Sequence, residues 1–108
     1  MNIKDKNALI TGSANRIGRE IAISLSQAGV NIAIHYNKSE KMAIETLNEV
    51  KKFNVNSKIF KADLSIESET LDLYDKVTEE LGPISILINL SLIHISEPTR
   101  QEAISYAV

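Results

Sequence analysis

The residues best suited to chemistry lie between two glycines near the N-terminus. Gly12 and Gly18 bracket a seven-residue segment, Gly12-Ser13-Ala14-Asn15-Arg16-Ile17-Gly18, that follows an apolar run and opens a helical pattern. A tight turn there presents backbone N–H groups and the positive end of a helix dipole to an anion. The segment therefore predicts a phosphate-binding loop; the alternative is that Gly12 serves only the turn and Gly18 only helix packing. Because Arg19 follows Gly18, the segment does not fit the P-loop pattern, which needs a lysine and a hydroxyl there.

These residues must be positioned by an alternation of apolar runs and amphipathic stretches. The apolar runs predict strands over residues 7–11, 30–34, 58–62 and 84–88. Helical patterns lie between them: from the loop to a stop at Gly29, from an N-cap at Ser39 to Val50, and over 67–81. The β-α-β-α-β-α-β order with short connections predicts an α/β fold, a parallel sheet covered by helices on both faces.

The apolar residues of each helical pattern predict which side faces the sheet. In the first helix, Ile17, Ile21, Leu25 and Ala28 recur at helical spacing and are expected on the buried face. The second and third helices are expected to bury Ala43, Leu47 and Val50, and Thr70, Tyr74, Val77 and Leu81, respectively.

Composition excludes several classes of protein and partner. The 108 residues are 44% hydrophobic and 24% charged, with no cysteine, which excludes a disordered or disulfide-stapled chain. Twelve basic and fourteen acidic residues are spread along the chain, so no basic stripe indicates nucleic acid. No apolar run is long enough to span a membrane, and no cluster has metal-ligand spacing. The lack of cysteine and of a signal peptide fits a cytoplasmic protein.

Three segments resemble motifs of one enzyme family. Thr11 to Gly18 looks like the Thr-Gly-x-x-x-Gly-x-Gly loop of the short-chain dehydrogenase/reductase family. Asp63-Leu64 resembles the adenine-contacting pair after its third strand, and Leu87-Ile88-Asn89 resembles the opening of its Asn-Asn-Ala-Gly motif. The resemblance covers residues 1–89 and implies the N-terminal part of a Rossmann-type doubly wound parallel sheet, strand order 3-2-1-4, truncated.

One departure from the family pattern points to a subgroup. Arg16 stands where the family's middle glycine usually lies, and residues 35–39 read His-Tyr-Asn-Lys-Ser; together they are similar to the pteridine-reductase-like subgroup. An NAD-preferring site needs a carboxylate after the second strand, which would repel the 2′-phosphate of NADP. No acid occurs there before Glu40, whereas Lys38 and Arg16 offer positive charge and Ser39 a hydroxyl. We therefore expect NADP(H) as the cofactor.

The loop, the segment after the second strand and the resemblance together predict the cofactor-binding residues. They are Gly12, Ser13, Asn15, Arg16, Ile17, Gly18, His35, Tyr36, Asn37, Lys38, Ser39, Asp63, Leu64 and Asn89. For His35, packing or hydrogen bonding is the alternative; for Lys38, it is an ordinary surface position. No metal ligand is predicted.

The resemblance implies an oxidoreductase that uses NADPH to reduce a carbonyl, or a pterin or folate C=N bond, in a small-molecule substrate. A 3-oxoacyl-thioester (acyl carrier protein) reductase is the alternative within the family, and a non-catalytic NADP-binding regulator the alternative outside it. The parent protein is expected to be a homo-tetramer. Since the family's catalytic Ser and Tyr-x-x-x-Lys do not occur in this chain, no catalytic residue is assigned and the chain by itself is expected to be inactive.

Residues 90–108 resemble a different kind of sequence. Leu90 to Arg100 and Ile104 to Val108 look like the in-frame translation of a Nextera-type sequencing-library adapter, with an index filling the codons between them. We therefore expect a cofactor-binding segment over 1–89 and a non-native tail over 90–108, in which His94 and Tyr106 have no functional meaning. This expectation leaves the fourth strand as an exposed sheet edge and the isolated chain marginally stable.

Overall fold

The computed structural model of the chain describes residues 3–12, 16–90 and 105–107. The elements are β1 (Asn7–Thr11), α1 (Arg16–Gln27), β2 (Asn31–Tyr36), α2 (Glu40–Val50), the 3-10 turn η1 (Lys51–Phe53), β3 (Ser57–Lys61), α3 (Glu67–Glu80), β4 (Ile86–Asn89) and β5 (Ser105–Ala107). The predicted alternation of strands and helices is confirmed. The first strand has the predicted bounds, and the ends of the next three differ by one or two residues.

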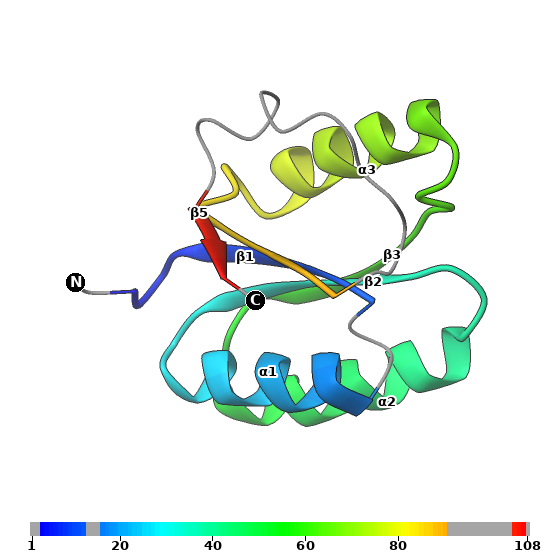
Figure 1. The fold of residues 1–108 in the computed structure, drawn as a ribbon. Helices are drawn as coiled ribbons and strands as arrows, with labels where there is room; N and C mark the ends of the chain where they lie inside the picture. The colour runs from blue at the N-terminus through cyan, green and yellow to red at the C-terminus, as the bar shows by residue number, and fades with distance from the viewer. Residues whose placement is uncertain (1–2, 13–15, 91–104, 108) are drawn as a thin grey trace.

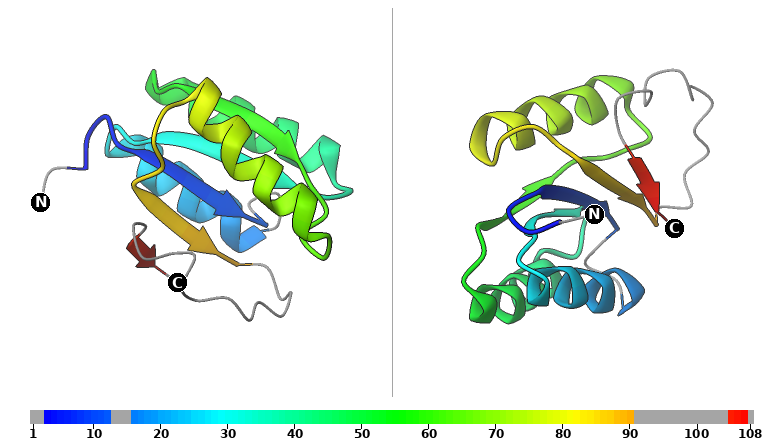
Figure 2. Two further views of the ribbon diagram at one scale, coloured as in Figure 1. Left: turned by 90° about the horizontal axis from the view of Figure 1, so that it is seen from above. Right: turned by 90° about the vertical axis from the view of Figure 1, so that its left-hand side faces the viewer.

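The strands form one parallel sheet in the order β3-β2-β1-β4-β5. The predicted order 3-2-1-4 is therefore confirmed. Figure 1 shows α1 and α2 on one face of the sheet and α3 on the other, and the second view in Figure 2 shows the same three layers. Since all strands run in the same direction, the segments that follow β1, β2, β3 and β4 leave the sheet at one edge.

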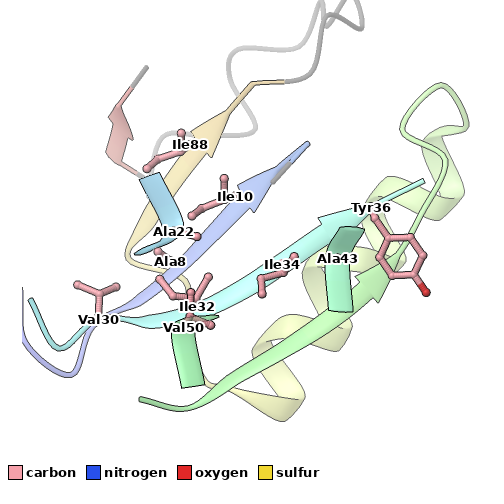
Figure 3. Packing of buried hydrophobic residues seen from close by; sticks show 10 residues of the cluster. All are labelled: Ala8, Ile10, Ala22, Val30, Ile32, Ile34, Tyr36, Ala43, Val50 and Ile88. Carbon is pink, nitrogen blue, oxygen red and sulfur yellow. The ribbon is translucent and has the colours of Figure 1, made fainter. Parts of the chain in front are cut away.

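Alternation along each strand divides the core between the two faces. Ile10 and Ile34 belong to the cluster under α1 and α2, ten of whose residues are labelled in Figure 3. Leu9 and Ala33 belong to the cluster that includes Leu73 of α3. The strands thus bury apolar side chains on both faces, which explains why their sequences read as continuous apolar runs.

The buried face of α1 differs from the predicted one. Gly18, Ala22 and Ser26 are buried, whereas Ile17 is 65% exposed. The helix lies so close to the sheet that small residues occupy the contact, and the larger Ile21 and Leu25 pack beside it only partly buried. Ala28 is exposed and lies beyond the end of the helix.

The other two helices also bury a neighbouring row of residues. In α2, Ala43 and Val50 are buried as predicted, but Thr46 is buried more fully than Leu47. In α3, Leu73 and Val77 are buried, while Thr70, Tyr74 and Leu81 are partly exposed. Of the predicted residues, Ala43, Val50 and Val77 are therefore buried, and the others lie on the flanks of the two helices.

The first helix ends at Gln27, and Gly29, the predicted stop, follows two residues later. This glycine has φ +87°, a left-handed conformation that L side chains rarely adopt. The amide of Val30 then donates to the carbonyl of Leu25 at 3.1 Å, which satisfies a carbonyl of the last helical turn.

The expectation that β4 forms an exposed edge is wrong for this chain. β5 pairs in parallel with β4, and Ile86, Leu87 and Ile88 lie opposite Ser105, Tyr106 and Ala107. An open strand edge is a row of unpaired backbone donors and acceptors, and any extended segment that reaches it can pair with it. Residues 91–104 and 108 of the expected non-native tail lie outside the described ranges. Among the helices in the described ranges, none is long and apolar enough to cross a membrane.

Candidate functional site

The ends of β1 and β4 are joined by a side-chain hydrogen bond. The parallel register sets Thr11 opposite Asn89, and Oγ1 of Thr11 donates to Oδ1 of Asn89 at 2.8 Å. A longer contact of 3.4 Å joins the same hydroxyl to the carbonyl of Ile88. Thr11 lies two residues after Leu9, and Asn89 two after Leu87, so both lie on the α3 face of the sheet. The hydroxyl fixes how the two strands end relative to each other.

The predicted phosphate loop, residues 12–18, begins immediately after Thr11. Gly12 has φ +72°, which glycine adopts without the cost that a side chain would add. The loop leads into α1 at Arg16, so the first helical turn opens at the same edge of the sheet, and Gly18 is buried there. The predicted residues Ser13 and Asn15 lie outside the described ranges. The described part of the loop therefore places its first glycine and the start of α1 at the carboxyl edge of the sheet.

His35 is buried at the end of β2, where it bridges two other chain segments. Its side chain is 4% exposed. The amide of Gly12 donates to Nδ1 at 2.9 Å, and Nε2 lies 2.9 Å from the carbonyl oxygen of Ala62. Burial lowers the pKa of His35, and the hydrogen bond to Ala62 opposes this effect. The imidazole thus contacts the protein backbone on both sides.

Tyr36, the last residue of β2, points into the other face of the sheet. It is buried in the cluster under α1 and α2, as Figure 3 shows. Its hydroxyl donates to Oε2 of Glu40 at 3.4 Å. Burial, followed by the nearby Glu40 carboxylate, raises the pKa of Tyr36. The carboxylate of Glu40, the first acidic residue after β2, therefore accepts a hydrogen bond from Tyr36.

Ser39 occupies the predicted N-cap position of α2, but its side chain makes no capping hydrogen bond. Its backbone has φ −92° and ψ 60°, outside the extended conformation typical of a side-chain cap. Only its carbonyl joins the helix, accepting from the amide of Ala43 at 3.0 Å. The hydroxyl is on the surface, beside the half-buried Asn37 and the exposed Lys38.

Positive charge gathers at this edge of the sheet. Arg16 and Lys38 are both exposed, one at the start of α1 and the other after β2. Lys38 lies close enough to the Asp63 carboxylate to lower its pKa, although hydrogen bonds from Ser65 are the larger cause. Ile17 adds an exposed apolar surface next to Arg16. A ligand that combines phosphates with apolar or aromatic groups would find both kinds of contact here.

The segment between β3 and α3 is held by residues that the sequence analysis missed. Oδ1 of Asp63 accepts from the amide and the hydroxyl of Ser65, at 3.0 and 2.6 Å. The amide of Asp63 donates to Oε1 of Glu69 at 2.8 Å. A glutamate in the first turn of a helix that reaches back to an upstream amide is a variant of the capping box, and this pattern could have identified Glu69. These contacts fix where the Asp63 carboxylate lies.

Leu64 is 9% exposed and belongs to the cluster under α3. Its side chain is therefore occupied by packing, so only its backbone is available to a ligand. Thr11 was also missed as a positioning residue; its signal is a polar side chain that ends an otherwise apolar strand.

The structure brings most of the predicted residues to one edge, but they fall into two groups. Arg16, Ile17, Lys38 and Ser39 are exposed and available to a ligand. The side chains of His35, Tyr36 and Leu64 are buried and support the edge by packing and hydrogen bonding. Within the described residues, no group of three or more His, Asp or Glu side chains could hold a metal ion. The arrangement is suited to binding an anionic ligand along the carboxyl ends of the strands.

Similar proteins share both the sequence pattern and the fold. The chain is 36% identical over 89 residues to an L-rhamnose 1-dehydrogenase (NADP(+)) of Thermoplasma acidophilum, covering 82% of this chain and 35% of that protein. It is 32% identical over 85 residues to a 3-oxoacyl-[acyl-carrier-protein] reductase of Staphylococcus epidermidis, covering 79% and 35%. The chain thus spans about a third of the length of the curated relatives it matches.

A solved structure agrees with these relatives. A Burkholderia cenocepacia protein crystallised with bound NADP superimposes with a TM-score of 0.78 at 34% identity, over 82% of this chain and 34% of that one. The sequence profile of the short chain dehydrogenases matches residues 6–105, which is most of the chain. On this evidence, the chain belongs to the short-chain dehydrogenase/reductase family.

Proposed function

We propose that this chain is the cofactor-binding part of an NADP(H)-dependent oxidoreductase that reduces a carbonyl group of a small molecule. The observation that carries the proposal is the charge at the sheet edge: Arg16 and Lys38 are exposed, and the first acid after β2, Glu40, is directed to Tyr36. A 2′-phosphate is a dianion that such cations attract, whereas NAD recognition needs a carboxylate there.

Each group of residues would have a separate part in binding NADP(H). The phosphate loop and the start of α1 would hold the pyrophosphate, and Gly12 supplies the turn that this approach requires. Arg16, Lys38 and Ser39 would hold the 2′-phosphate, and Asp63 would contact the adenine. When bound, the cofactor supplies the hydride. Asn89 lies at the end of β4, toward the region where the nicotinamide half would extend.

The pteridine-reductase-like resemblance supports a pterin or folate C=N bond as the reduced group, because Arg16 and the segment 35–39 carry that resemblance. The Staphylococcus epidermidis relative supports a second candidate, the reduction of a 3-oxoacyl thioester on acyl carrier protein. Steady-state assays of the complete protein with dihydropteridine, dihydrofolate and 3-oxoacyl-thioester substrates distinguish the two. The complete protein is proposed to be a cytoplasmic homo-tetramer, and this chain alone is proposed to be inactive.

The cofactor assignment is tested by charge removal in the complete protein. Arg16→Ala and Lys38→Ala are each expected to weaken NADPH binding about tenfold, the loss of one charge-assisted contact, with little effect on NADH. Lys51→Ala is the matched control, because Lys51 is exposed beyond α2 at the opposite edge of the sheet. Equal losses for NADPH and NADH, or an equal effect of the control, would show that these cations do not recognise a 2′-phosphate.

A further inference from the structure

One buried side chain joins the two segments that the proposed cofactor would contact. The hydrogen bonds of His35 connect Gly12 of the phosphate loop to Ala62 of the β3–α3 segment. The parallel register explains how this is possible. Ile10 of β1 pairs with Ile34, and Phe60 of β3 pairs with His35, so the ring lies between the ends of both neighbouring strands.

The hydrogen bonds determine the protonation state of the ring. A backbone amide can only donate, so Nδ1 must accept from Gly12 and carries no proton. A carbonyl can only accept, so Nε2 must donate to Ala62 and carries the proton. Both contacts are satisfied by one species, the neutral Nε2–H tautomer. Protonated imidazole would turn a second N–H toward the amide of Gly12.

The contact with Gly12 uses a donor that a loop of this kind would otherwise present to a ligand. Because the Gly12 amide is engaged by His35, Gly12 contributes its left-handed turn rather than its N–H group. The turn sets the direction in which the chain leaves β1 after Gly12. On the other side, Ala62 immediately precedes Asp63, so the same ring fixes the start of the segment that carries the Asp63 carboxylate.

We propose that His35 is a positioning residue, which as the neutral Nε2–H tautomer holds the phosphate loop and the adenine-side segment at their binding distance without touching the cofactor. This inference rests on the proposed NADP(H) binding. It predicts that cofactor affinity depends on the neutral imidazole.

The charged groups around the ring do not change this prediction. β1 and β4 carry none in their described residues. Charged or titratable side chains on the other neighbouring elements include Arg16, Lys38, Lys61, Asp63, Glu69 and Tyr74. None of them is among the causes that lower the pKa of His35, which are burial opposed by the Ala62 hydrogen bond. The ring therefore stays neutral until the pH falls below its ordinary value of 6.5, and affinity is lost as the pH falls through the lowered pKa.

Two substitutions separate the two hydrogen bonds. In His35→Asn, Oδ1 stands where Nδ1 was and can accept from Gly12, but the side chain is too short to reach Ala62. In His35→Gln, the amide nitrogen reaches the position of Nε2 and can donate to Ala62. His35→Phe keeps the ring volume and removes both bonds, so it controls for packing.

The assay is equilibrium titration of the complete protein with NADP⁺ between about pH 5 and 8, since NADPH decays in acid. At about pH 7.5 we expect His35→Phe, which loses both bonds, to bind about tenfold more weakly than the wild type. His35→Asn and His35→Gln each keep one bond and are expected to bind about threefold more weakly than the wild type. The 2′-phosphate itself titrates with a pKa near 6, so affinity changes with pH for every variant. The pH profile of His35→Asn, which has no imidazole, measures this contribution of the phosphate. The wild type is expected to lose more affinity than His35→Asn as the pH falls.

The proposal is overturned if His35→Phe binds as tightly as the wild type, if neither His35→Asn nor His35→Gln binds more tightly than His35→Phe, or if the wild type and His35→Asn have the same pH profile. A second measurement does not depend on the cofactor: imidazole ¹⁵N spectra should show an unprotonated Nδ1 and a protonated Nε2 at about pH 7.5. The opposite tautomer would also overturn it. Failure of the wild type to bind NADP⁺, with this tautomer present, would instead refute the proposed function.

Discussion

Replacing Thr11 by valine tests whether the hydroxyl that joins β1 to β4 contributes to stability. Thr11 is 3% exposed, and its Oγ1 donates to Oδ1 of Asn89 at 2.8 Å. Valine has the same branched shape, so the packing of the strand is preserved. The substitution exchanges the hydroxyl for a methyl group and so removes the hydrogen bond to Asn89 and the longer contact with the Ile88 carbonyl.

Two opposing terms set the expected magnitude. A buried polar group that loses its partner costs about 1–3 kcal/mol. The extra methyl group of valine returns up to about 0.8 kcal/mol through apolar burial. Because Asn89 is only half-buried, water can partly replace the lost donor, which favours the lower end of the range. We therefore expect Thr11→Val to lower the free energy of unfolding by about 1 kcal/mol.

The assay is urea unfolding of the complete protein, with Thr78→Val as the matched control. Thr78 is exposed on α3, and its hydroxyl donates to the carbonyl of Tyr74 at 2.9 Å. Water can satisfy that carbonyl, so the control is expected to lose less than about 0.5 kcal/mol. If the two variants lose the same stability, or Thr11→Val loses none, the hydroxyl between β1 and β4 does not stabilise this edge of the sheet.

Two further predictions concern the phosphate loop and the C-terminal residues. Gly12→Ala is expected to destabilise the complete protein by about 1–2 kcal/mol, which is the cost of a side chain at φ +72°. Gly12→Asn is expected to cost less, because asparagine tolerates this conformation. Equal melting temperatures for the two variants and the wild type would contradict this prediction. Sequencing the gene from genomic DNA, with a library that does not use this adapter, is expected to give different codons at positions 90–108. It is also expected to reveal the family's Ser and Tyr-x-x-x-Lys downstream. Unchanged codons would refute the adapter origin of the tail.

The order of the elements could be predicted from the sequence because it depends on local patterns. Apolar runs of strand length, helical spacing and stop signals such as Gly29 act within a few residues of one another. The short connections then require parallel strands with crossover helices. The buried face of α1 could not be predicted in this way. Hydrophobicity favoured Ile17, but close approach of the helix to the sheet selected Gly18, Ala22 and Ser26 by size.

The edge of the sheet shows a similar limit. The sequence analysis expected β4 to be an exposed edge of the sheet, yet the structure pairs β5 with it. Backbone pairing needs an extended segment within reach and has little dependence on which side chains it carries. A pattern of residue types therefore cannot exclude such a pairing.

The sequence by itself determined the family and the α/β order, because glycine spacing, apolar runs and strand ends are local patterns. It also predicted the residues of a candidate site. Only the tertiary structure decided what those residues do. It separated the exposed Arg16 and Lys38 from the buried His35, Tyr36 and Leu64. It also joined Gly12 to His35 and Thr11 to Asn89, pairs that lie 23 and 78 residues apart in the chain. Hydrogen bonds across such separations depend on strand register and burial, which exist only once the sheet has formed.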